Sequence, residues 1–161
     1  MKMNVEQIAE YDRRQSAIRV AGVATVASAL GYRAFGAIRP SVTDDPGEER
    51  TFEGSTGFGR NDPSAAPIPA LYSAAIAVAG EVAVWLRADS EVSAEVILEM
   101  FEVGFVELPP TAEVPEWILF DAITEAMQIL HKRTASHAAV AARLLEKGVV
   151  TAEEVRALTE A

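Results

Sequence analysis

Two histidines, His131 and His137, are the side chains in this sequence best suited to metal or acid–base chemistry, because the chain has no cysteine. Imidazole nitrogens bind zinc and exchange protons near neutral pH. Zinc-binding histidines on one helix stand four residues apart and share a face, whereas a spacing of six turns the second by about 240°. We therefore expect a pair of surface or helix-end histidines, with no metal ion and no other cofactor.

Other catalytic arrangements are not indicated. A nucleophile would have to be Ser or Thr beside a histidine, and the sequence has no Gly-x-Ser-x-Gly turn to present one. The stretch GEERTFEGSTGFGR contains Gly54, Gly57 and Gly59, but it lacks the lysine and the helix start that a phosphate loop requires. We expect these glycines to serve turns.

Several aromatic residues lie around a predicted break in the chain at 107–115. We expect them to belong mainly to the core, and we expect Trp117, which follows a proline and a glutamate, to be partly exposed. The residues concerned are Phe101, Phe105, Trp117 and Phe120.

The elements that must position these residues are mainly helical. Apolar residues recur at intervals of three and four, which predicts helices over the segments 13–30, 70–87, 91–104 and 115 onward. A bend is expected near 134–136, a helix end at Gly148, and a capping box from Thr151 to Glu154 that opens a last short helix.

Two short segments, 33–40 and 50–58, alternate apolar and polar residues, which predicts a small β ribbon. An acidic, turn-rich link joins them, and residues 59–69 have the composition of a loop. The expected fold class is therefore α+β, mainly α-helical, with five to six helices and a small β ribbon or sheet after the first helix.

Size and charge narrow the choice of partners. A chain of 161 residues that is 50% hydrophobic predicts one domain over 1–161, with residues 1–12 as a loose N-terminal extension. The net charge of −10 argues against nucleic acid as a partner. The charged N-terminal stretch argues against a secretion signal and favours the cytoplasm, and the apolar run at 64–80, with its two prolines, favours a core helix over a membrane span.

The segment AIRVAGVATVASALG at 17–31 resembles the signature helix of the FtsH-type (M41-like) zinc metallopeptidases, Ala-Ile-His-Glu-Ala-Gly-His-Ala-Val-Val-Ala followed by Leu-Gly. The family's His, Glu and His fall on Arg19, Val20 and Val23. The residues that match the pattern are Ala17, Ile18, Ala21, Gly22, Ala24, Val26, Ala27, Leu30 and Gly31.

The resemblance continues along most of residues 13–158. FGAIRP and STGFGR are similar to two strands of the family, and PALYSAAIAVAGEVAVWL is similar to its Ala-Gly-x-Ala-Ala-Glu helix, whose acidic residue falls on Val84. AMQILHKRTASHAAVAARLLEKGVVTAEEV is similar to the closing helices.

The resemblance implies the scaffold of a peptidase without its activity. In the family's motif two histidines hold zinc and the glutamate activates the metal-bound water. Valine has no lone pair to offer, and Arg19 places a permanent cation where a metal ion would bind. The family's third ligand is an aspartate, and the nearest acidic residues, none of which aligns with it, are Asp89, Glu91 and Glu95.

Arg19 has no carboxylate one helical turn away. We expect its guanidinium to lie in water or to pair with Asp12 or Glu81. The alternative is that it binds the carboxylate of a peptide in the inherited cleft.

The leading hypothesis is therefore a non-catalytic protein- or peptide-binding or regulatory module that holds an extended segment by β-addition along the ribbon. Its candidate cleft residues are Arg19, Glu81 and Trp117. Two alternatives stay open. One is a hydrolase that uses a different site in the same cleft, and the other is a structural module that forms a homo-oligomer through its alanine-rich helices.

Overall fold

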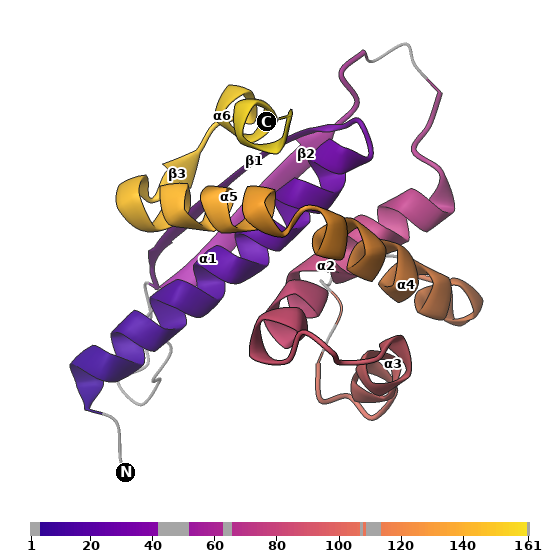
Figure 1. The fold of residues 1–161 in the computed structure, drawn as a ribbon, viewed down its shortest axis with the longest axis horizontal. Helices are drawn as coiled ribbons and strands as arrows, with labels where there is room; N and C mark the ends of the chain where they lie inside the picture. Colours follow the sequence, from indigo (N-terminus) through magenta and orange to yellow (C-terminus); the bar gives the residue numbers. More distant parts are fainter. Residues whose placement is uncertain (1–3, 42–51, 63–65, 107, 109–113, 161) are drawn as a thin grey trace.

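A computed structural model of the chain describes residues 4–41, 52–62, 66–106, 108 and 114–160. The fold is α+β and mainly helical, as the sequence predicts, with a small antiparallel sheet after the first helix (Figure 1). The elements in chain order are α1 (Val5–Ala29), β1 (Arg33–Pro40), β2 (Phe52–Gly59), α2 (Ala70–Ala88), α3 (Ala94–Glu102), α4 (Glu116–Lys132), α5 (Thr134–Lys147), β3 (Val149–Val150) and α6 (Ala152–Glu160).

The long helix α1 is the centre of the fold and contacts the sheet, α2 and α5 (Figure 1). It begins at Val5, so residues 5–12, for which we expect a loose extension, are part of this helix. A capping box explains the early start: the N–H of Gln7 donates to Oδ1 of Asn4 at 2.8 Å, and the N–H of Asn4 donates to Oε1 of Gln7 at 2.9 Å. The first turns are polar and largely exposed, which is why apolar periodicity does not reveal them.

The sheet has the strand order β2-β1-β3. The predicted ribbon is confirmed, since β1 pairs with β2 along its whole length, from Arg33 opposite Gly59 to Pro40 opposite Phe52. The two-residue strand β3 is an addition that the sequence analysis did not foresee. Gly148, at φ 76°, ends α5 and accepts a hydrogen bond from the N–H of Ile38 at 2.8 Å.

Small residues let the elements approach α1 closely. A Cβ atom on Gly36 would lie 2.4 Å from Cγ1 of Val20, and a Cβ atom on Gly54 would lie 2.5 Å from Cγ2 of the same residue. On another side of α1, a Cβ atom on Gly22 would lie 2.6 Å from Cβ of Ala83 in α2. The sheet and α2 are therefore both held at distances that larger residues at these positions would prevent.

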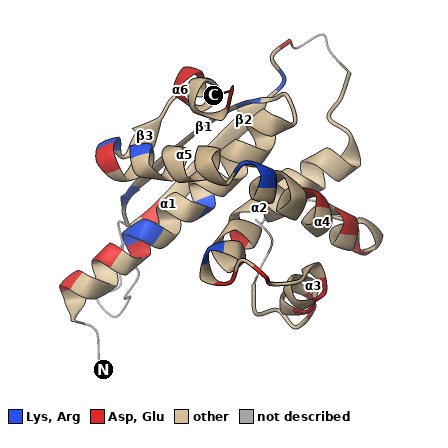
Figure 2. Ribbon diagram, in the orientation of Figure 1, with Lys and Arg blue, Asp and Glu red and all other residues tan. Residues whose placement is uncertain are grey.

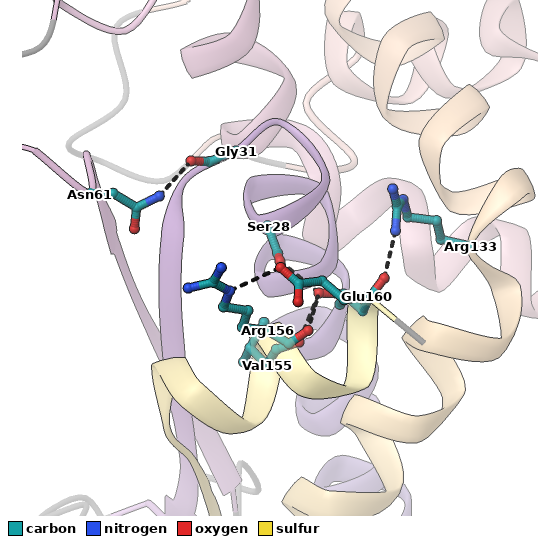
Figure 3. A network of polar contacts seen from close by, with 8 residues as sticks. Ser28, Gly31, Asn61, Arg133, Val155, Arg156 and Glu160 are labelled. Carbon is teal, nitrogen blue, oxygen red and sulfur yellow. Dashed lines mark hydrogen bonds and ion pairs between the residues drawn. The ribbon is translucent and has the colours of Figure 1, made fainter.

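Polar contacts fasten the C-terminal helix α6 to the end of α1 and to Arg133, which lies between α4 and α5 (Figure 3). The hydroxyls of Ser28 and Thr159 share a hydrogen bond of 2.7 Å, and the guanidinium of Arg133 donates to the carbonyl of Thr159 at 2.7 Å. The predicted capping box at the start of α6 is confirmed, with the reciprocal bonds between Thr151 and Glu154 both at 3.2 Å.

By length and composition α2 is the one helix in the described residues that would pass as a membrane span, a test that core helices of folded proteins also pass. In this structure it packs against α1 and α4, and 44% of its most apolar window is buried. Its bounds, Ala70–Ala88, match the predicted helix at 70–87.

Candidate functional site

A cleft of about 730 Å³ lies between α1, β2 and α2. All three motif positions of the resemblance, Arg19, Val20 and Val23, line it, together with Val84, on which the family's acidic residue falls. The other lining residues are Tyr11, Asp12, Gln15, Ser16, Phe52, Glu53, Gly54, Thr56, Ala77, Gly80, Glu81, Phe105 and Val106. The four positions that the resemblance aligns with motif residues of the family, Arg19, Val20, Val23 and Val84, thus lie around the same cleft.

Arg19 pairs with Glu81 across the cleft, which is one of the pairings expected from the sequence. Its Nε donates to Oε1 of Glu81 at 2.9 Å, and the two side chains are 46% and 24% exposed. Gly80 lets α2 come close enough, because a Cβ atom there would lie 3.3 Å from the carbonyl oxygen of Arg19. A partly exposed pair of this kind contributes only about 0.2–1 kcal/mol to stability.

The valines make the floor of the cleft apolar. Val20 is 4% exposed and is held beneath Gly36 and Gly54, while Val23 contacts Gly80 of α2. None of these side chains can bind a metal ion or transfer a proton. No group of three or more His, Cys, Asp or Glu side chains that could hold a metal ion occurs in the part of the chain that the structure describes.

β2 is an edge strand of the sheet, and part of it lines this cleft. The backbone N–H of Ile38 points to β3. Because backbone N–H and C=O groups alternate between the two edges of a strand, those of Ala37 and Phe35 point to β2. Their partners in the register are Ser55 and Gly57, which therefore point back to β1. It follows that Phe52, Gly54, Thr56 and Phe58 direct their N–H and C=O groups away from the sheet, and three of these four residues line the cleft.

The two histidines lie elsewhere. Of the expected pair of surface or helix-end histidines, both lie near helix ends, but His137 is buried and not at the surface. His137 in α5 is 6% exposed, and its Nε2 lies 3.1 Å from the carbonyl oxygen of Ile18, so the nitrogen must carry the proton and donate. Burial lowers the pKa of His137 below its usual value, and the charge of Arg87 acts in the same direction. His131 is exposed in the last turn of α4.

The expectation that the aromatic residues belong to the core is also wrong in part. Phe105 is 73% exposed and lines the cleft, and Phe120 is 38% exposed. Trp117, at the start of α4, is 78% exposed, more than the partial exposure expected of it, and it is not among the cleft residues. The acidic residues Asp89, Glu91 and Glu95 do not line the cleft either.

Sequence reasoning missed Tyr11 and Phe105 at the cleft. Tyr11 is 54% exposed on the part of α1 that the sequence analysis treated as an extension. Recognition of the Asn-x-x-Gln capping signal at residues 4–7 would have placed Tyr11 two helical turns before Arg19. Phe105 follows α3 and has no comparable signal in the sequence.

No protein-family model matches the sequence, and no curated protein matches it. The geometry of the cleft is therefore the basis for a functional proposal.

Proposed function

We propose that this chain is a catalytically inactive, peptidase-like module that binds an extended peptide segment as a strand added to the outer edge of β2. The observation that carries the proposal is that Phe52, Gly54 and Thr56, whose backbone groups are not used in the pairing with β1, line the same cleft as Arg19, Val20 and Val23. Backbone hydrogen bonds along such an edge supply affinity, and the adjacent space receives alternate side chains of the bound segment.

The composition of the cleft favours binding over catalysis. Ser16 and Thr56 are hydroxyl residues of the lining, but no histidine lies among the lining residues that the structure describes. His137 is on α5 and its imidazole donates to Ile18 instead. A hydrolase that uses another set of groups in the same cleft therefore finds less support than a binding module.

A self-associating module finds less support for a different reason. The small residues that suggested close helix packing between copies are used inside the chain, where Gly22 of α1 lies against Ala79 and Ala83 of α2. A homo-oligomer would have to use other surfaces.

A proline substitution in β2 tests the proposal. Thr56→Pro removes an outward N–H that takes no part in the β1–β2 ladder, and proline is tolerated on edge strands. We expect wild-type protein to select binders from a displayed library of random twelve-residue peptides, and Thr56→Pro to lose them. The matched control Thr56→Val keeps the N–H and should keep the binders. Equal binding to all three proteins would contradict the proposal, provided that circular dichroism shows each to be folded.

The inactive part of the proposal has its own measurement. After dialysis, elemental analysis of the untagged protein should find less than about a tenth of a zinc ion per chain, since a structural or catalytic site would retain it. Zinc near one ion per chain would contradict the proposal and return hydrolysis as the leading function.

A further inference from the structure

We propose that the segment bound along β2 carries an arginine side chain, whose guanidinium enters the cleft and contacts its carboxylates and exposed aromatic rings. This inference rests on the proposed function and specifies the chemistry of the partner. It is carried by two separate features of the lining, its charge and its aromatic residues.

The charge of the cleft favours a cation. Among the lining residues that the structure describes, Asp12, Glu53 and Glu81 bring three carboxylates, whereas Arg19 is the single basic residue. Arg19 pairs with Glu81, and Glu53 pairs with Arg39 at 2.7 Å. A carboxylate has two oxygens and about four lone-pair sites, so one ion pair leaves capacity for a second cation.

The field of the whole molecule acts in the same direction. The formal net charge is −10, and acidic residues lie on α3 and α4 as well as on α1 (Figure 2). Such a surface attracts a basic segment from a distance and repels an acidic one. An acidic peptide or a free C-terminal carboxylate held by Arg19 would have to approach against this field.

The aromatic residues favour arginine over lysine. Tyr11 from α1 and Phe105 after α3 both line the cleft, and both are large hydrophobic side chains left 54% and 73% exposed. A planar guanidinium stacks on aromatic faces and donates two parallel hydrogen bonds to a carboxylate. A cleft that is lined by both aromatic rings and carboxylates is therefore a better site for arginine than for the compact ammonium of lysine.

The test uses blocked, fluorescein-labelled seven-residue peptides of alternating Thr and Val with one variable central residue. That residue is Arg, Lys, Glu or citrulline, which has the shape of arginine without its charge. Fluorescence anisotropy at low salt should show the Arg peptide binding about tenfold tighter than the citrulline peptide, with Lys between them and Glu weakest. The advantage of Arg should shrink as salt is added.

Two variants with equal loss of charge locate the effect. Asp12→Asn with Glu53→Gln should remove most of the difference between Arg and citrulline. The control, Asp121→Asn with Glu146→Gln, removes two exposed carboxylates on α4 and α5 outside the cleft and should preserve that difference.

The outcomes separate this inference from the proposed function. If Arg and citrulline peptides bind equally and Thr56→Pro abolishes both, strand addition stands and the arginine preference is overturned. If the Arg peptide binds but Thr56→Pro leaves its affinity unchanged, the proposed function is overturned. The inference that an added strand carries the arginine is then overturned as well. If no peptide binds, both are overturned.

Discussion

The contact between Val20 and the glycines of the sheet is the packing feature that places β2 beside the cleft, and it yields a quantitative prediction. Gly54→Ala would place a Cβ atom 2.5 Å from Cγ2 of Val20. Carbon atoms in contact lie about 3.5–4.0 Å apart, so Val20 or the strand must move by roughly 1 Å. Overpacking of this size costs about 1–3 kcal/mol, against a gain of about 0.5–1 kcal/mol from replacing a glycine within a strand.

Removing the obstacle should reverse the penalty. Val20→Ala deletes both γ-methyl groups and by itself lowers the free energy of unfolding by about 2 kcal/mol, because it leaves a cavity. In that background the Cβ atom of Gly54→Ala fills part of the space. We therefore expect Gly54→Ala to be neutral or stabilising when combined with Val20→Ala, which makes the two substitutions coupled by about 1–3 kcal/mol.

Equilibrium unfolding in urea for the wild type, both single variants and the double variant measures this coupling. Gly59→Ala is the matched control, since Gly59 lies in the same strand and a Cβ atom there meets nothing within 4 Å. Costs that add to within about 0.5 kcal/mol would refute the reasoning. It would also be refuted if Gly54→Ala proved as harmless as Gly59→Ala.

Three further predictions concern single residues. Burial lowers the pKa of His137 in the folded state, so the stability that its neutral form contributes is present above about pH 6.5 and is lost as the pH falls through the folded-state pKa. Urea midpoints should therefore decline from pH 7 to pH 5 in the wild type and in His131→Gln, and less in His137→Gln. The pKa of Glu154 is also lowered, mainly by the hydrogen bond from the backbone N–H of Thr151. Glu154→Gln should therefore be less stable than the wild type at neutral pH, and the difference should vanish as acid protonates the carboxylate. Urea unfolding across the acid range measures this difference. Gly148→Ala forces a side chain into the left-handed region at φ 76°, and the free energy of unfolding should fall by about 1–2 kcal/mol, as measured by calorimetry. Gly148→Asn should be less affected.

Features encoded in a few neighbouring residues were predictable from the sequence. Gly148 ends α5 in the left-handed conformation, and Thr151 with Glu154 caps α6, because each signal needs only one turn of chain. The bounds of α2 follow from its apolar composition. The start of α1 was equally local, at Asn4 and Gln7, but it is polar and does not contribute to an apolar pattern.

Features that depend on distant segments were not predictable. The two residues of β3 form a strand only because Ile38, more than a hundred positions earlier, donates to Gly148. His137 is buried because α5 lies against α1, and Phe105, which follows α3, is exposed. For Arg19, its charge indicated an acidic partner, but only the approach of α2 selects Glu81 over Asp12 as the pairing that the structure describes.

Residue-resolved amide hydrogen exchange in β2, with and without a bound peptide, tests strand addition most directly. The account predicts a period of two. Gly54 and Thr56 should exchange rapidly in the free protein and gain protection with peptide, whereas Ser55 and Gly57, bonded to β1, should be protected in both states. Peptide binding without new protection at Gly54 and Thr56 would contradict strand addition on this edge.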